Sequence, residues 1–430
     1  MKLFVEIAVV ACLFGVAAHA QETKAPPKTI AVKAAHLIDA KAGRVLDQQA
    51  VLIVGERIEK VGPVKEIPVP AGATVIDLGS ATLLPGLIDA HVHLTGDPQY
   101  SGYKSLGISV PRQALTGAKN ARLTLEAGFT TVRNVGAAGY SDVALRDAIN
   151  AGEIPGPRMM VSGPALGSTG GHCDENLLAP EFAHRDEGVA DGVAAITAKT
   201  REVIKYGADV IKFCASGGVF SKGDLPGTEQ YSPAEMSALV EEAHRQGRKV
   251  AAHAHGAQAI IDAAKAGVDS IEHGSLIDDE GIRTMKEHGT YLVADIYNDD
   301  FILGLGKQYG FTDEMLEKER MVGQQQREGF RKAAQAGVKI AFGTDAGVYP
   351  HGGNARQFAY MVKCGLTPMQ AIQAATVNAA DLLGWSDQVG SLEPGRFADL
   401  IAVEGDPLQD VTTLEHVKFV MKGGQVIKNP

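Results

Sequence analysis

The chain has few of the residues that stabilise small cross-linked folds. Only 4 cysteines and 1 tryptophan occur among 430 residues. No CxxC pair is present among them, which excludes a zinc knuckle and a disulfide framework, so we expect buried or idle thiols. The cysteines are Cys12, Cys173, Cys214 and Cys364. We also find no internal repeat and no low-complexity tract beyond the N-terminal leader.

Positive charge is also scarce. The chain has 41 Lys and Arg against 51 Asp and Glu, which gives a net charge of −10. An acidic surface argues against nucleic acid or an anionic membrane as the main partner, and solubility alone explains it. We therefore expect a small-molecule or dipeptide-like substrate, and a homo-oligomer.

Long apolar runs are absent except near the N-terminus. Lys2 precedes an apolar run from Ile7 to Val16, and Ala18-His19-Ala20 follows as an A-x-A-like cleavage site. The run is too short to serve as a stable membrane anchor. We expect residues 1–20 to be a signal peptide, with no membrane anchor after cleavage. The mature chain would be periplasmic or secreted by a bacterium, without Cys12.

The rest of the chain is long enough for a large barrel and a small accessory domain. Residues 21–28 are polar and predict a disordered lead-in. Residues 29–84 and 385–430 alternate apolar and polar positions, with Gly, Asp and Pro between the runs. The two ends predict one composite, β-sandwich-like domain. Residues 85–384 then form the barrel.

Within residues 85–384, short apolar strands alternate with amphipathic helices. The strand candidates are LLPGLIDAHVH, FTTVRNVG, RMMVSGPAL, ADVIKFCASG, KVAAHAHG, DSIEHGS, TYLVADIY and KIAFGTDAG. The helix candidates are Pro111–Ala127, Gly188–Tyr206, Ser232–Gln246, Ala257–Ala266, Asp278–His288, Thr312–Ala336 and Pro368–Leu383. Eight βα units in series predict an α/β fold, a (β/α)₈ TIM-like barrel.

Residues able to bind metal stand at the C-terminal ends of these strands, where such barrels have their active sites. They are His91, His93, Lys212, His253, His255, His273 and Asp345. The two-residue spacing of His91 and His93 directs both imidazoles to the same side of a strand. Two converging nitrogen ligands can bind one ion, although an isolated HxH pair is weak evidence.

The motifs around these residues resemble those of the amidohydrolase superfamily, in its order and spacing over nearly all of the mature chain. They are PGLIDAHVH at 85–93, IKF at 211–213 with SGG at 216–218, AHAHG at 252–256, IEHG at 271–274, GTDAG at 343–347 and SLEPGRFADL at 391–400. The chain is most similar to the imidazolonepropionase-like branch, which includes Xaa-Pro and Xaa-Arg type dipeptidases and ochratoxin-hydrolysing amidohydrolases. Asn134 departs from the common Asp of strand two, which we interpret as neutral.

The resemblance implies two divalent metal ions and a role for each residue. His91 and His93 correspond to ligands of the more buried ion, and His253 and His273 to ligands of the second. Lys212 corresponds to the lysine that CO₂ carboxylates to bridge both ions. Asp345 corresponds to the carboxylate that binds the first ion and acts as general base.

Elementary chemistry agrees with these roles. A bare ammonium repels a dication, whereas a carbamate on Lys212 offers oxygen ligands, and a desolvated site favours the neutral amine that carbamylation needs. Two ions roughly 3.5–4 Å apart can share a hydroxide and lower its pKa. Asp345 can take the proton as water attacks and pass it to the departing nitrogen. Zinc is the expected ion, with Mn, Co or Ni as alternatives.

Several residues admit a second interpretation. Lys212 can instead be an interior lysine paired with Asp345 or Glu272. His255 can replace His253 as ligand, or contact substrate. Glu272 precedes His273 and so should point to the opposite side of its strand, which suits a structural role. His351 fits a loop residue better than a ligand.

Substrate contacts are predicted from position alone. His172 follows strand three and overhangs the barrel mouth, where it either contacts substrate or is an ordinary loop histidine. Tyr231 follows the loop Ser216–Gln230, which can form a lid. Arg356 follows strand eight and can pair with a substrate carboxylate or make a salt bridge at a helix start.

These observations favour hydrolysis of a peptide-like C–N bond in a dipeptide or N-acyl amino acid, ochratoxin-like amides included. A cyclic, imidazolone-like amide is an alternative that export disfavours. A catalytically silent metal- or ligand-binding barrel is another, opposed by the intact His-His-Lys-His-His-Asp set. A mononuclear deaminase of the same fold would not need Lys212.

Overall fold

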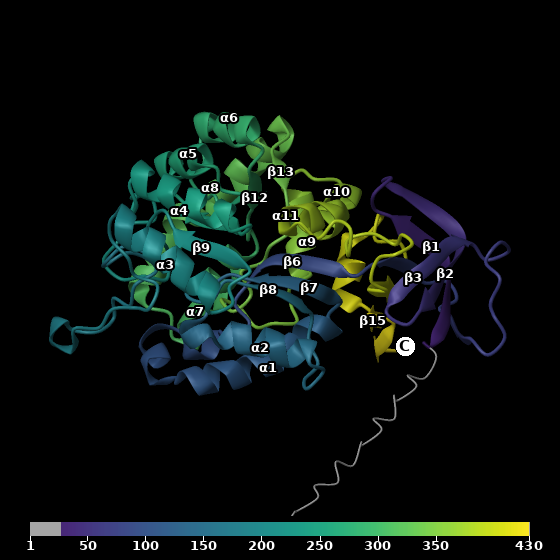
Figure 1. Cartoon of the computed structure of the whole chain (residues 1–430). Helices are drawn as coiled ribbons and strands as arrows, with labels where there is room; N and C mark the ends of the chain where they lie inside the picture. The colour runs from purple at the N-terminus through teal and green to yellow at the C-terminus, as the bar shows by residue number, and fades with distance from the viewer. Residues whose placement is uncertain (1–26, 430) are drawn as a thin grey trace, which may run out of the picture.

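The computed structural model describes residues 27–429. The predicted signal peptide and most of the predicted lead-in lie outside the described residues. The described chain is an α/β protein in which helices surround parallel strands and a separate sheet lies at one side (Figure 1). No helix in this part of the chain is both long and apolar enough to cross a membrane.

The separate sheet is mixed and has eight strands from both ends of the chain. They are β1 (Thr29–Asp39), β2 (Arg44–Val54), β3 (Arg57–Pro63), β4 (Thr74–Asp77), β5 (Thr82–Pro85), β14 (Leu400–Val403), β15 (Phe419–Lys422) and β16 (Gln425–Lys428). N-terminal and C-terminal segments therefore lie side by side (Figure 1).

Side chains alternate between the two faces along the strands, and the apolar ones form a core that belongs to this sheet. Ile30, Val32 and Ala34 of β1 belong to one buried cluster that also holds residues of β2, β3, β5, β14 and β15. Ala31 belongs to a smaller cluster with other residues of β2. A period of two places successive side chains on opposite faces, so the sheet curls around the larger cluster.

The remaining eight strands are parallel. They are β6 (Leu87–Val92), β7 (Phe129–Asn134), β8 (Arg158–Val161), β9 (Val210–Cys214), β10 (Lys249–Ala254), β11 (Ser270–His273), β12 (Tyr291–Val293) and β13 (Lys339–Ile340). They pair in the orders β6-β7-β8 and β9-β10-β11-β12-β13.

Single parallel bridges join these two groups at both ends. Leu166, after β8, pairs with Phe213 of β9, and Val92 of β6 pairs with Ala346, after β13. Backbone hydrogen bonds from Leu166 N to Lys212 O (2.8 Å) and from Asp345 N to His91 O (2.8 Å) reinforce both junctions. The eight strands thus follow one another around a ring in chain order, as in a (β/α)₈ barrel.

The helices connect the strands and cover the ring. They are α1 (Val110–Glu126), α2 (Ser141–Asn150), α3 (Val193–Lys205), α4 (Pro233–Arg245), α5 (Ala257–Ala266), α6 (Asp279–His288), α7 (Asn298–Tyr309), α8 (Asp313–Ala336), α9 (Arg356–Lys363), α10 (Pro368–Gln373) and α11 (Ala379–Leu383). Short helical turns are η1 (Pro98–Tyr100), η2 (Gly102–Gly107), η3 (Ala138–Tyr140), η4 (Pro180–Phe182), η5 (Ala374–Asn378) and η6 (Val411–His416).

Local signals explain several boundaries. Ser232 and Glu235 form a capping box at the start of α4, which satisfies amide groups that have no helical partner. Gly289 and Gly337 end α6 and α8 with positive φ angles of 69° and 79°, where glycine carries no steric cost. The predicted helix Pro368–Leu383 is α10 and α11 joined by a π-helical turn, η5.

The first predicted strand divides at Gly86. β5 pairs with β14 of the mixed sheet, and β6 pairs with β7 of the ring. A side chain at Gly86 would collide with Thr130. Glycine therefore lets the chain pass directly from the mixed sheet into the barrel, close to His91 and His93.

Candidate metal centre and active site

One cavity of about 730 Å³ opens at the C-terminal ends of the parallel strands. Side chains from β6, β9, β10 and β11 and from the segments after the other strands line it. All seven metal-competent residues named above lie in this lining: His91, His93, Lys212, His253, His255, His273 and Asp345. The structure therefore brings together residues that are up to 254 positions apart in the chain.

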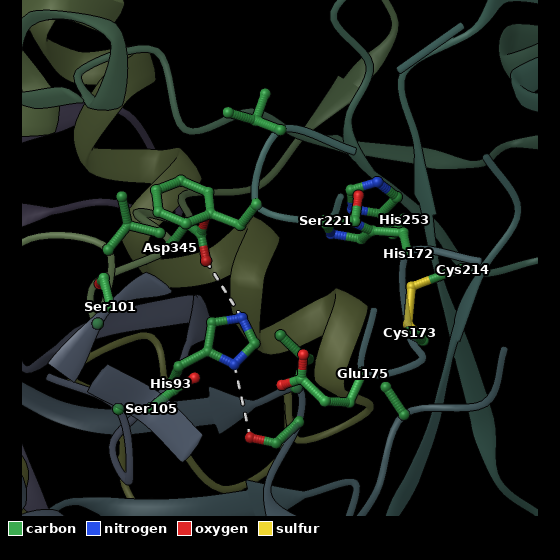
Figure 2. Close-up of a pocket in the computed structure, with 18 of the residues that line it drawn as sticks. His93, Ser101, Ser105, His172, Cys173, Glu175, Cys214, Ser221, His253 and Asp345 are labelled. Atoms are coloured by element: carbon green, nitrogen blue, oxygen red, sulfur yellow. Dashed lines mark hydrogen bonds and ion pairs between the residues drawn. A yellow bond between two sulfur atoms is a disulfide. The ribbon is translucent and has the colours of Figure 1, made fainter. Parts of the chain in front are cut away.

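His91, His93 and Asp345 converge at one side of the cavity. Oδ1 of Asp345 lies 3.4 Å from Nε2 of His91 and 3.1 Å from Nε2 of His93. Figure 2 shows His93 between Asp345 and a backbone carbonyl. Asp345 has a φ of 54°, a left-handed backbone conformation that non-glycine residues rarely adopt.

A second group of imidazoles lies beside the first. Ligand nitrogens of His253, His255 and His273 lie within 4.8 Å of one another. His273 also forms such a group with His91 and Asp345, so it connects the two halves of the site. The structure places both His253 and His255 in ligand positions, and the choice between them stays a prediction.

Each imidazole has one ring nitrogen anchored to the protein. Nδ1 of His91 contacts Glu272 at 2.7 Å, Nδ1 of His273 contacts Asp295 at 2.8 Å and Nδ1 of His255 contacts Ser275 at 2.7 Å. Nε2 of His253 contacts the Gly217 carbonyl at 3.2 Å. This arrangement orients each ring and leaves its other nitrogen for a metal, as is usual for histidine ligands.

The geometry around His91 fits a cation directly. In the neutral imidazole, donation of Nδ1–H to Glu272 leaves Nε2 of His91 with a lone pair, and this buried nitrogen has no hydrogen-bond partner. Nε2 of His93 and Oδ1 of Asp345 face the same point. Three converging lone pairs repel one another unless a cation lies between them, so these residues fit a divalent ion.

Lys212 lies in β9 and is buried, with 4% of its surface exposed. Its side chain forms no ion pair with Asp345, Glu272 or any other carboxylate in the described chain. Burial lowers the pKa of Lys212 to about 8, although Glu272 and Asp345 oppose the shift. No ion pair therefore supports the paired-lysine alternative, and the lowered pKa favours the neutral amine that carbamylation requires.

The other charges suit a metal site. Burial opposes ionisation of Asp345, yet the adjacent imidazoles of His91 and His93 hold its pKa well below the usual value. Burial, together with His172 and His273 nearby, lowers the pKa values of His253 and His255 well below that of a free imidazole. Asp345 is thus ionised and the two imidazoles are neutral, which are the forms that bind metals.

The position of Glu272 contradicts the prediction that its side chain points to the opposite side of the strand from His273. It does not point away from the site but lies inside the ring, where it accepts from His91 at 2.7 Å and from Arg133 at 2.7 Å. The alternation rule failed because His273 has a φ of 68°, so the strand pattern ends there and both side chains reach the interior. Arg133 also donates to the Ala90 carbonyl and to Ser270.

The cysteines contradict another prediction, namely that all of them are buried or idle thiols. Cys173 and Cys214 form a disulfide across 41 residues of sequence, and Cys364 alone is free and buried among the described cysteines. The bond joins the loop after β8 to the end of β9 beside the cavity (Figure 2). Sequence spacing carries no information on such a pair, because the contact exists only once the two strands are adjacent.

His172, next to Cys173, lies over the site as predicted. Its ring stacks on that of His253 with centroids 4.2 Å apart, and Nδ1 contacts Ser221 Oγ at 2.8 Å. Ser221 in turn donates to Asp224 at 2.6 Å. Burial lowers the pKa of His172 to about 4, so its neutral ring can exchange hydrogen bonds with a bound molecule.

The family follows from a comparison with known proteins. The model of the amidohydrolase family matches residues 82–427. The chain belongs to the amidohydrolase family. The match spans all eight parallel strands, and it confirms the resemblance found in the motifs.

Individual relatives agree with this amidohydrolase assignment. An ochratoxinase from Aspergillus niger is 36% identical over 412 residues, which cover 90% of this chain and 84% of the relative. An imidazolonepropionase from Geobacillus kaustophilus is 27% identical over 90% of this chain and 91% of its own. A solved structure of a Xaa-Pro dipeptidase with methionine bound in its active site is 40% identical, with a TM-score of 0.87 over 93% of this chain and 99% of that chain. The neighbours support a hydrolase with a TIM-barrel fold and an extra domain.

Two predicted substrate contacts lie elsewhere in this amidohydrolase. The hydroxyl of Tyr231 donates to the Ala190 carbonyl at 3.0 Å, away from the described cavity lining. Arg356 begins α9 and donates to the Tyr297 hydroxyl at 2.7 Å. Neither side chain can contact a molecule in the cavity in this arrangement. Loop and helix-start geometry, which the sequence pattern does not determine, directs both.

Other residues that sequence reasoning left aside support the site. Asp295 accepts from His273, Asn298 and Gln326, and so orients one predicted ligand. Asn134, interpreted as neutral, holds the Leu94 amide just after the HxH motif at 2.7 Å. His351 is a buried structural residue that contacts the His93 carbonyl at 3.1 Å. Only Asp295 carried a usable signal, because it directly follows an apolar strand.

Proposed function

We propose that this amidohydrolase is a metal-dependent enzyme that hydrolyses the C–N bond of a dipeptide or N-acyl amino acid, ochratoxin-like amides included. The convergence of His91, His93 and Asp345, with lone pairs facing one point, carries the proposal. The ochratoxinase and the dipeptidase structure that resemble this chain support the choice of an amide substrate.

The donor set offers two adjoining positions for divalent ions, Zn²⁺ being the expected metal. His91, His93 and Asp345 would hold one ion, and His253 and His273 the other, with His255 as the alternative to His253. A carbamate on Lys212 would provide oxygen ligands to both. Bound ions supply Lewis acidity toward the amide carbonyl and make water more acidic.

Asp345 is the side chain that would transfer the proton during hydrolysis. Asp345 is ionised at neutral pH, so one carboxylate oxygen can take the proton from an attacking water. It can then give that proton to the departing nitrogen, which leaves as an amine. Asn298 donates to Oδ2 of Asp345 at 3.3 Å and keeps the carboxylate oriented.

The surroundings of the site hold the substrate. His172 stacks over His253 and faces the cavity, where it is placed to exchange a hydrogen bond with the amide or an acyl group. Residues of the loop after β9 and of α7 and α8 also line the cavity, among them Phe220, Ile302 and Val322. A cavity of about 730 Å³ accommodates a dipeptide or a larger N-acyl amino acid.

The Cys173–Cys214 disulfide supports the proposal that the mature chain is exported. Disulfides persist mainly in oxidising compartments such as the bacterial periplasm. Mass spectrometry of the protein secreted or exported by its host should give a chain that begins at Gln21. A chain that retains Met1 and in which Cys173 and Cys214 are both reduced would contradict export.

The catalytic proposal is tested with protein reconstituted with Zn²⁺ and bicarbonate. A panel of dipeptides, N-acyl amino acids and one cyclic imidazolone should show release of free amine from linear amides. Absence of bound metal together with absence of turnover on every linear amide would reject the proposal. Turnover of the cyclic compound alone would favour the alternative function.

A further inference from the structure

The cavity contains one buried carboxyl group without a partner. Glu319, on α8, lines the cavity and is only 4% exposed. No hydrogen bond or ion pair involves its side chain within the described chain. Its neighbour Lys318, in contrast, binds Asp224 at 2.7 Å and the Ser221 carbonyl at 2.8 Å.

Glu319 is an exception among the buried acids. The other buried carboxylates in the described residues all accept hydrogen bonds or form ion pairs: Asp89, Asp142, Glu242, Glu272, Asp295, Asp345 and Asp399. A buried carboxyl group without a partner is costly. Glu319 lines the cavity, so a bound molecule can supply the partner that the described chain lacks.

Helical spacing places Glu319 between two apolar residues of the cavity wall. Met315, Glu319 and Val322 follow one another on the cavity face of α8, and Ile302 of α7 lines the same cavity. Burial raises the pKa of Glu319 to about 8, with Asp295 and Asp299 adding to the shift and Arg327 opposing it. A cation that entered here would remove this penalty, because it would pair with the ionised carboxylate.

The lining itself supplies no such cation. Besides Lys212 in the metal site, its only lysine and arginine among the described residues are Lys222 and Arg185. Both are exposed, and Arg185 pairs with Asp191 at 2.7 Å. The lining is rich in carboxylates, and Arg356, the predicted partner of a substrate carboxylate, binds Tyr297 instead.

We propose that Glu319 is a specificity-determining residue that pairs with a cationic nitrogen of the substrate. The nitrogen is either the free amino terminus of a dipeptide or the side chain of a lysine or arginine residue. This inference rests on the proposed amide hydrolysis and assigns its preferred substrate class. Neutral N-acyl compounds without a basic residue would then be the poorer substrates.

Paired substrates that differ in one charge test the proposal in the zinc-loaded enzyme. N-acetyl-Ala-Lys against N-acetyl-Ala-norleucine tests a side-chain cation, and Ala-norleucine against its N-acetyl form tests the amino terminus. In one pair the cationic member should have a kcat/KM at least about tenfold higher, as expected for a charged hydrogen bond. Glu319→Gln should reduce that ratio by about tenfold or more.

Glu317→Gln is the matched control, because Glu317 lies on the same helix but is exposed. It should leave the ratio unchanged. An equal ratio in wild type and Glu319→Gln, or a wild-type preference for the neutral member of both pairs, would overturn the inference. Thermal unfolding of each variant checks that the fold is retained.

A binding measurement separates this inference from the catalytic proposal. Calorimetry with pentylamine and pentanol compares a cation with a neutral molecule of the same length, without any turnover. Pentylamine should bind more tightly than pentanol to wild type, and Glu319→Gln should lose the difference. If no amide is hydrolysed but this difference appears, the amide-hydrolase proposal fails and the cation site stands. Equal binding of the two probes to wild type would refute the cation site.

Discussion

At the scale of residues, the site depends on contacts that fix which nitrogen of each imidazole is free. Glu272 orients His91, Asp295 orients His273 and Ser275 orients His255. The free nitrogens and Asp345 then meet without any cation from the chain between them. We therefore attribute this arrangement to the ion that it would bind. The stability of the metal-free chain alone does not explain it as well.

Asp345→Asn tests the assignment of the base. The amide oxygen can still approach an ion, but the side chain can no longer accept a proton. We expect kcat to fall by about 10²- to 10⁴-fold while much of the metal stays bound. Steady-state kinetics and metal analysis of the same preparation measure both effects, and a fully active variant would show that the base lies elsewhere.

Glu272→Gln tests the buried pair beneath His91. The substitution leaves Arg133 as an unpaired cation in the interior, so the free energy of unfolding should fall by about 3–5 kcal/mol. Metal affinity should fall about 10- to 100-fold, because His91 loses its charged acceptor. Denaturant unfolding and metal titration provide the measurements.

Lys307→Met serves as its control. Both members of the Lys307–Asp313 pair are exposed, and the loss of this pair should cost only about 0–1 kcal/mol. Similar losses in both variants would mean that the Glu272–Arg133 pair has no special role.

At the scale of elements, the predicted site residues lie in or just after the parallel strands. The backbone conformation at each position determines where the side chain points. The period of a strand was enough to predict that His91 and His93 share a side, although the pairing of β6 with β7 shifts register between Asp89 and Val92. It failed at Glu272 and His273, where β11 ends in a left-handed residue. Helices α2, α7 and α9 were missed, although α2 and α7 are no shorter than the predicted helices α5 and α6.

The disulfide gives a prediction at this scale. A bond that closes 41 residues restricts the unfolded chain, which corresponds to about 4 kcal/mol in the chain-entropy account. A Cys173→Ser, Cys214→Ala variant should therefore have a lower Tm, and its KM should rise because the loop that carries His172 is released. Thermal unfolding and kinetics measure the two effects.

A reductant provides the control for that variant. It should lower the Tm of wild type but leave the doubly substituted protein unchanged. An unchanged Tm of wild type after complete reduction, verified by thiol counting, would contradict a stabilising role of the bond.

At the scale of the whole molecule, the order of the motifs along the chain predicted the fold better than it predicted individual contacts. The eight βα units and the ligand set follow from apolar strands that end in His, Lys or Asp, because the barrel gathers strand ends at one rim. The Cys173–Cys214 bond, the buried Glu319 and the direction of Arg356 depend on which loops become neighbours. No local pattern contains that information.

Metal should also stabilise the entire fold. The proposed ligands come from β6, β9, β10, β11 and the segment after β13, so a bound ion would connect distant parts of the ring. An ion at 100 times its dissociation constant stabilises the folded state by about 2.7 kcal/mol. Chelation should therefore lower the Tm and Zn²⁺ should restore it, whereas identical Tm values would contradict a site built across the ring.

The central claim, that these strand ends form a metal-dependent amide-hydrolysing site, is tested most directly by titrating Zn²⁺ into metal-free protein in the presence of bicarbonate. Bound metal and hydrolysis of the best linear amide are measured at each step. We predict negligible activity without metal and activity that rises to a plateau at about two ions per chain. Full activity in the metal-free protein, or saturating metal without hydrolysis of any linear amide, would contradict the claim.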